Sequence, residues 1–138
     1  MKQIVIDQPE RISKWVADRM GSGWHGPRGS AIGLLEDGEI IAGVLFDSWN
    51  GASICMHVAA VPGKRWMTRE YLRMCFAYPF QQLQCSKIIG LVGSKNEVAR
   101  RFDEHLGFQL EATLEAAHPD GALLLYTMTK EQCRWVSI

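Results

Sequence analysis

The chain has 138 residues, 47% of them apolar and 22% charged, which is typical of one globular domain with a sizeable core. Its 15 lysines and arginines balance its 15 aspartates and glutamates, so it lacks the surplus positive charge that a general nucleic-acid binder needs. No apolar run approaches the roughly 18 residues of a membrane span, so we expect a single domain over residues 1–138 with no membrane or nucleic-acid partner.

The first part of the chain alternates strand, helix and loop signals. Lys2–Ile6 predicts a short strand, and apolar residues keep helical spacing over Glu10–Met20. Residues 21–30 contain four glycines and a proline, a composition that sustains neither a helix nor a strand. This segment is therefore expected to be a loop that displays Trp24 and His25.

A meander of three strands is expected next, over residues 31–36, 39–48 and 52–61. Asp37-Gly38 and Asn50-Gly51 are two-residue hairpin signals between them. The third strand is almost wholly apolar, as in a central strand that is buried on both faces. His57 is its one polar interruption.

The second half begins with a basic loop, Lys64–Arg69, that runs into a helix with Thr68 as a candidate N-cap. Pro79 must kink or divide that helix, because its ring clashes with the preceding turn. Further strands are expected over residues 87–92, 109–117 and 122–129, followed by a short tail with one helical turn.

Residues 94–108 predict one complete helix between two of these strands. Ser94 and Glu97 have capping-box spacing, and Gly107 can end the helix. The expected apolar stripe consists of Val98, Ala99, Phe102 and Leu106, and the expected solvated face of Arg100, Arg101, Asp103 and Glu104. A helix that begins directly after a strand also offers an anion-binding end.

The cysteines, Cys55, Cys75, Cys85 and Cys133, form no CxxC pair and have no histidine at ligand spacing. With no secretory signal, we interpret them as reduced thiols in a cytoplasmic protein, and we expect no metal site. The element order is β-α-β-β-β-α-β-α-β-β. It predicts an α/β domain with a mixed sheet and helices on both faces.

This order and the helix motif resemble the GNAT superfamily, the Gcn5-related N-acetyltransferases. The motif residues are Asn96, Ala99, Phe102, Gly107 and Phe108, and the order covers nearly the whole chain. The resemblance implies a single GNAT-like domain with a mostly antiparallel sheet. The sequence also looks like small GNAT-type proteins that bacteriophages encode, for which the compartment would be the host cytoplasm.

The resemblance implies acetyl-CoA as the acyl donor. Backbone groups of the central strand would bind the pantetheine arm, the basic loop would face the pyrophosphate, and Arg100 or Arg101 would reach the phosphates. The implied coenzyme-binding residues are Ala59, Ala60, Val61, Lys64, Arg65, Trp66, Met67, Thr68, Arg69, Asn96, Arg101 and Phe102.

Two features depart from the family pattern. The pyrophosphate loop of the family is glycine-rich, whereas Lys64–Arg69 contains no glycine, so charge would have to replace close backbone approach. Many members also place a tyrosine after the position of Phe102, as the general acid for the departing thiolate. This chain has Asp103 there, and an ordinary aspartate is ionised at neutral pH and cannot donate a proton.

His57 is the candidate general base, since it interrupts the central strand near the position of the family's carboxylate base and since histidine titrates near neutral pH. The alternative is a histidine whose hydrogen bonds are satisfied within the sheet. Asp103 is a weaker catalytic candidate. Trp24 and His25 fall where the family lines its acceptor pocket, or they form a lid over the core.

The predicted function is N-acyl transfer by direct attack of an amine on the thioester, with the oxyanion held by backbone N–H groups near Val61. The acceptor would be a small-molecule or protein amine, and a homodimer is left open. The alternative is a GNAT-fold protein without acyl-CoA chemistry that serves as a binding or virion-associated module.

Overall fold

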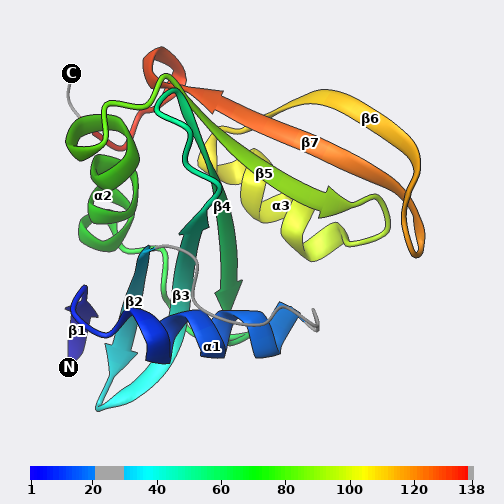
Figure 1. Cartoon of the computed structure of the whole chain (residues 1–138). Helices are drawn as coiled ribbons and strands as arrows, with labels where there is room; N and C mark the ends of the chain where they lie inside the picture. Colours follow the sequence, from blue (N-terminus) through cyan, green and yellow to red (C-terminus); the bar gives the residue numbers. More distant parts are fainter. Residues whose placement is uncertain (21–29, 137–138) are drawn as a thin grey trace.

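The computed structural model describes residues 1–20 and 30–136, and in these residues seven strands form one mixed sheet in the order β1-β2-β3-β4-β5-β7-β6 (Figure 1). The strands are β1 (Lys2–Val5), β2 (Ser30–Glu36), β3 (Glu39–Asp47), β4 (Ser53–Ala60), β5 (Lys87–Gly93), β6 (Gln109–His118) and β7 (Gly121–Thr129). The helices are α1 (Pro9–Met20), α2 (Arg69–Ala77) and α3 (Glu97–Leu106). No helix of the described residues is long and apolar enough to cross a membrane.

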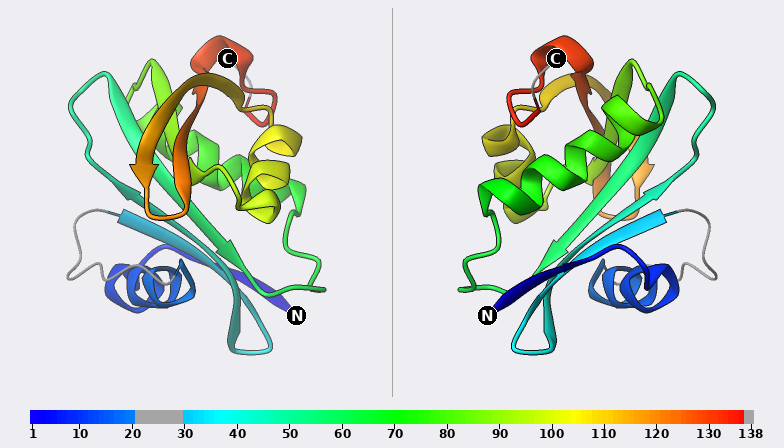
Figure 2. Two further views of the ribbon diagram at one scale, coloured as in Figure 1. Left: turned by 90° about the vertical axis from the view of Figure 1, so that its right-hand side faces the viewer. Right: turned by 90° about the vertical axis from the view of Figure 1, so that its left-hand side faces the viewer.

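The predicted α/β class and element order are confirmed. Of the strand pairs in the described residues, only β4–β5 is parallel. Helix α1 covers one face of the sheet, and α2 and α3 cover the other (Figure 2). The sheet therefore separates a small core under α1 from a large core under α2 and α3. Strand β4 lies between the two cores and contributes side chains to each.

Two facing glycines let α1 approach the sheet closely. Gly33 of β2 and Gly43 of β3 are cross-strand partners, directly under Ile12 and Val16 of the helix. A Cβ at Gly43 would lie 2.7 Å from Val16 Cγ2, a distance that side chains cannot tolerate without a shift. Ile12 and Val16 are fully buried in this notch, which fixes the position of α1 on the sheet.

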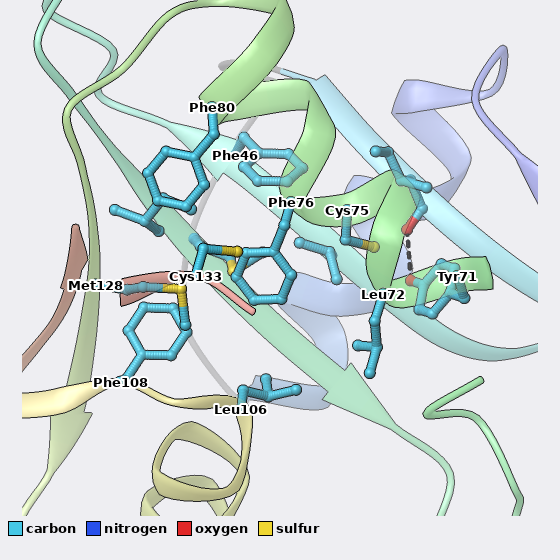
Figure 3. Close-up of a cluster of buried hydrophobic side chains, with 14 of the residues drawn as sticks. Phe46, Tyr71, Leu72, Cys75, Phe76, Phe80, Leu106, Phe108, Met128 and Cys133 are labelled. Atoms are coloured by element: carbon cyan, nitrogen blue, oxygen red, sulfur yellow. Dashed lines mark hydrogen bonds between the residues drawn. The ribbon is translucent and has the colours of Figure 1, made fainter. Parts of the chain in front are cut away.

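The large core centres on the aromatic face of α2. Phe76 lies among Phe80, Phe108, Met128 and Cys133, residues from four different segments of the chain (Figure 3). The Tyr71 hydroxyl donates to the Ile32 carbonyl at 2.8 Å, which joins α2 to β2 in the interior. All of the cysteines are free thiols, as predicted.

The predicted division of the second helix at Pro79 is confirmed. Helix α2 ends at Ala77, and a π-helical turn over Tyr78–Gln82 follows it. Leu83 N–H donates to the Tyr78 carbonyl at 2.9 Å, which closes this wider turn. A proline has no N–H to continue the α-helical ladder, and the chain accommodates it by widening the turn rather than by leaving the helix.

The predicted N-cap of α3 is wrong by two residues. Asn96, not Ser94, caps the helix, and its Oδ1 accepts the Ala99 N–H at 3.2 Å. The Ser94 hydroxyl instead accepts the Ala122 N–H at the start of β7. The helix end at Gly107 is confirmed, with this residue in the left-handed conformation.

The predicted faces of α3 are also partly wrong. Val98, expected in the apolar stripe, is 64% exposed, whereas Asp103, expected in solvent, is only 8% exposed. The side chain of Asp103 faces Gly90 of β5, because a glycine there leaves room for a side chain from the helix. Glu104 is exposed, as predicted.

The hairpin predicted between the second and third strands of the meander is a wider loop in the structure. Asn50-Gly51 lies within residues 48–52, and Asn50 Oδ1 accepts the N–H groups of Ala52 and Ser53 at 2.9 and 2.8 Å. Asparagine here makes a side-chain turn instead of a two-residue hairpin. In the tail, the predicted helical turn is present over Lys130–Gln132, and Thr129 and Gln132 form its capping box.

Candidate active site

The parallel strands β4 and β5 diverge soon after they start. They pair over Ser53–Cys55 and Lys87–Ile89, and beyond this point they separate (Figure 1). β4 stays with β3 as far as Ala60, while β5 stays with β7 as far as Gly93. Each strand is therefore left with one backbone edge that no neighbouring strand occupies, and unpaired backbone groups of this kind require another partner.

A cleft of about 180 Å³ opens where the two strands separate. Of the residues predicted to act, His57, Asn96, Phe102 and Asp103 meet in it. Its lining among the described residues is Met20, Met56, His57, Val58, Gly90, Leu91, Val92, Gly93, Asn96, Ala99, Phe102, Asp103, His118 and Leu123. The cleft thus joins side chains from both faces of the sheet in one place.

His57 forms a pair with Asp47, the last residue of β3. Its Nε2 lies 3.0 and 3.2 Å from the two carboxylate oxygens, and both side chains are about 15% exposed. Because a carboxylate only accepts, Nε2 donates, and in the neutral ring Nδ1 carries the basic lone pair. The pair therefore orients an imidazole at the cleft, and none of the described residues forms a hydrogen bond with its Nδ1, which can accept a proton.

Asp103 enters the cleft from the α3 side. Burial, reinforced by the neighbouring charge of Glu104, raises the pKa of its carboxyl to about 7. The prediction that this residue is an ordinary ionised aspartate is therefore wrong. Desolvation favours the neutral acid, so a substantial part of it keeps its proton at neutral pH.

The basic loop reaches the cleft through Trp66. This side chain is buried, and its ring lies edge-on to Phe102 of α3 with the centroids 5.2 Å apart. Thr68 is confirmed as the N-cap of α2, because its hydroxyl accepts the Tyr71 N–H at 3.2 Å. The buried Trp66 thus packs the loop against Phe102, a residue of α3 that lines the cleft.

Several of the cationic side chains of the basic loop and of α3 already have partners. Lys64 Nζ lies 3.1 Å from Glu36 Oε1, and this contact lowers the pKa of Glu36. Arg100 donates to the Tyr126 hydroxyl and the Ser94 carbonyl, both at 3.3 Å. Arg101 lies on the outer side of α3, away from the cleft, with Glu97 3.9 Å away.

Exposed cations remain at Arg65 and Arg69, and Met67 is half-buried between them. At the end of β4, the Val61 N–H donates to the Ile41 carbonyl at 2.8 Å. This bond occupies the Val61 N–H itself, so the predicted oxyanion donor near Val61 would have to be a neighbouring backbone N–H. Ala59 and Ala60 are paired with Gly43 and Ala42 of β3, and their other edge faces β5.

Two residues of the site had no role in the sequence analysis. Asp47 is a diagonal cross-strand neighbour of His57, which sits opposite Leu45, so correct strand register would have found it. His118, at the end of β6, lies against Gly93, and its Nδ1 accepts the Asp120 N–H at 3.1 Å. No local sequence signal places His118 there, because the hairpin of β6 and β7 carries it to the cleft.

A larger cavity, of about 590 Å³, lies between β2 and the second helix, beside Ser30, Met74 and Tyr78. Its lining among the described residues contains no carboxylate, imidazole, thiol or cationic side chain. The Ser30 and Tyr78 hydroxyls bond to each other at 2.6 Å. Among the described residues, the carboxyl and imidazole groups of Asp103, His57 and His118 line the smaller cleft, not this cavity.

The predicted acceptor residues Trp24 and His25 lie outside the described residues. Within residues 1–20 and 30–136, no group of three or more His, Cys, Asp or Glu side chains could hold a metal ion.

No protein-family model and no curated protein matches the chain. Solved structures do. The spermidine/spermine N-acetyltransferase SpeG from Vibrio cholerae, in complex with manganese ions, superposes with a TM-score of 0.72 at 14% identity, over 94% of this chain and 93% of that one. The ribosomal-protein-S5-alanine acetyltransferase from Vibrio fischeri gives 0.64 at 11%, over 91% and 72%. A probable acetyltransferase gives 0.65 at 17%, over 88% and 69%. The chain has the GNAT fold, as the resemblance predicted.

Proposed function

We propose that this GNAT-fold chain is an N-acetyltransferase that moves the acetyl group of acetyl-CoA to an amine. The observation that carries the proposal is the cleft between β4 and β5 with the His57–Asp47 pair at its wall. A base that one carboxylate orients, beside two unpaired backbone edges, suits the deprotonation of an amine next to a thioester. The structural neighbours, which are acetyltransferases by name, support the same reaction class.

Acetyl-CoA fits this site as a substrate. The open edge of β4 over Met56–Ala60 offers N–H and C=O groups to the amides of an extended pantetheine arm. The basic loop Lys64–Arg69 and the start of α2 offer positive charge to the phosphates. Asn96 and Phe102 line the inner end, next to where the thioester would lie.

The part of His57 follows from its hydrogen bond to Asp47. Nδ1 accepts the proton that the amine loses on attack, and the imidazolium that forms is stabilised by the carboxylate 3.0 Å from Nε2. Because Asp47 accepts on the other side, it also fixes the ring orientation and tautomer. The amine attacks the thioester directly, with no covalent intermediate on the protein.

The test is product formation with defined amines. The protein is incubated with acetyl-CoA and, separately, with spermidine, a peptide that begins with alanine and a lysine-containing peptide, the first two taken from the substrates that the neighbours' names state. Mass spectrometry detects the acetylated amine, and a thiol reagent detects released CoA. We expect product with at least one amine and a loss of about 10²-fold in rate for His57→Ala.

Binding of acetyl-CoA without product from any amine would contradict catalysis and favour a non-catalytic acyl-CoA-binding module. The matched control is His105→Ala, which removes an exposed histidine of α3 from a position that is not part of the cleft lining. This variant should keep the wild-type rate.

A further inference from the structure

Asp103 is buried, and the packing of the fold does not by itself explain why a carboxyl lies there. It is 8% exposed, and its open side faces the cleft. None of the described residues donates a hydrogen bond or an ion pair to its side-chain oxygens. A carboxyl that is buried without such partners costs stability, and a neutral acid costs less than a carboxylate.

Its surroundings keep cations away. Arg100, one turn earlier on α3, donates to the Tyr126 hydroxyl and the Ser94 carbonyl instead. Tyr126 of β7 in turn donates to Glu104 at 2.7 Å. Among the described residues, the titratable groups that line the same cleft from other elements are His57 of β4 and His118 of β6.

Gly90 lets the side chain of Asp103 lie close against the face of β5. A Cβ at this glycine would lie only 3.2 Å from Asp103 Oδ2, so any other residue there would press on the carboxyl. His57, by contrast, lies on the face of the sheet that α1 covers, because Ala59, two residues further along β4, packs under α1. The base and the acid thus enter the cleft from different elements, β4 and α3.

We propose that Asp103 is the acid that protonates the sulfur of the departing coenzyme A. This proposal rests on the proposed function. The amine nitrogen bonds to the acetyl carbon, the carbon–sulfur bond breaks, and its electron pair goes to sulfur. Asp103 gives its proton to that sulfur, which leaves as a thiol, while His57 holds the proton from the amine. Solvent then returns a proton to Asp103 and takes one from His57.

A comparison of the pKa of the acid with the pKa of the thiol supports this assignment. A thiol has a pKa of about 8.5, and a general acid works best when its own pKa lies near the working pH. Burial and the charge of Glu104 bring the pKa of the Asp103 carboxyl to about 7. A short buried acid can therefore do here what an exposed aspartate cannot.

The first test measures the free protein. Carbon-13 NMR of the aspartate carboxyls, with Asp103→Asn to assign the signal, should give a titration of Asp103 near pH 7. A midpoint near pH 4 would overturn the proposal, because the group would then be ionised whenever the enzyme works.

The second test measures turnover and binding. Asp103→Asn should bind acetyl-CoA within about two-fold of the wild type but lose about 10²-fold in kcat. The wild-type kcat should also fall as Asp103 ionises above pH 7, and the variant should lack this fall. Asp7→Asn, at an exposed turn, is the matched control and should match the wild type.

The outcomes separate the two proposals. If the wild type acetylates an amine and Asp103→Asn keeps both its kcat and its pH profile, the role of Asp103 is refuted while the proposed function stands. If the wild type makes no product from any amine, both are refuted.

Discussion

Asp47 and His57 form the residue pair on which the proposed chemistry depends. Replacing Asp47 with Asn should leave the ring in place but remove the acceptor that holds the proton on Nε2. We expect a loss of about 10-fold to 10²-fold in kcat, with acetyl-CoA affinity unchanged, because the Asp47 carboxylate bonds His57 and is not among the residues proposed to bind the coenzyme. Steady-state kinetics together with calorimetry would separate the two quantities, and an affinity loss without a kcat loss would contradict the assignment.

The ionisation of Asp103 should also make the free energy of unfolding depend on pH, and this effect can be measured without an activity assay. Its pKa is about 7 in the folded chain against 3.8 in the unfolded one, so the folded state binds more protons between these values. Stability attributable to this group is therefore complete below pH 4 and falls as the pH rises to 7, by about 4 kcal/mol at most.

Asp103→Asn cannot ionise. It should unfold like the wild type at pH 4 and be more stable by about 2–4 kcal/mol at pH 8. Urea unfolding across this range measures the difference. Equal stabilities at pH 8 would show that the carboxylate is well solvated. The control Asp7→Asn should follow the wild-type curve throughout.

The sequence identified His57 and Asp103 as candidates, but it could not predict their hydrogen-bond partners or their protonation states. His57 stands out as a polar residue in an apolar strand, whereas its partner Asp47 emerges only from the register of β3 on β4. Asp103 has an ordinary neighbourhood along the chain. Its altered acidity comes from burial against Gly90, a residue of another element, so no local pattern could reveal it.

At the scale of elements, the docking of α1 depends on the glycine notch. Gly43→Ala would place a methyl group 2.7 Å from Val16 Cγ2 and should destabilise the fold by about 1–3 kcal/mol. Urea unfolding measures this loss.

Val16→Ala supplies the control for that prediction. It removes the clashing methyl group, so the double variant should be less destabilised than the sum of the two single ones. Strict additivity would show that the helix is not held by this contact.

The basic loop should depend on Trp66 for its position. Trp66→Ala removes a buried ring that contacts Phe102 and Tyr71, and it should destabilise the fold by about 3–5 kcal/mol. Trp66→Phe keeps part of this packing and should lose less. If both variants unfold like the wild type, the loop is not anchored through this ring.

The periodicity of the sequence predicted which helices and strands exist, but it predicted less well where each of them ends. The helix motif placed α3 correctly, but Asn96 outcompeted Ser94 as the cap because the serine hydroxyl bonds to the start of β7. The splitting of β4 from β5 has no sequence pattern at all. It results from each strand keeping its own antiparallel partner after Cys55 and Ile89.

At the scale of the whole molecule, the order of elements predicted an α/β domain with a mixed sheet, and the resemblance in order and helix motif predicted the GNAT fold; the strand order and the single parallel pair came from the structure. The cytoplasmic location, the homodimer and the phage relationship remain predictions. The acceptor amine depends on surfaces that no strand register or helix motif encodes. The fold positions the cleft, and the side chains in it decide the reaction.

Calorimetric titration of the whole chain with acetyl-CoA tests the central claim most directly. We predict saturable binding of one acetyl-CoA per chain. Binding should be weakened at least several-fold in the Lys64→Ala/Arg65→Ala variant and unchanged in Lys2→Ala, which removes the other cation beside Glu36. Absence of binding at millimolar acetyl-CoA would contradict the account, because the cleft between β4 and β5 would then have no acyl donor.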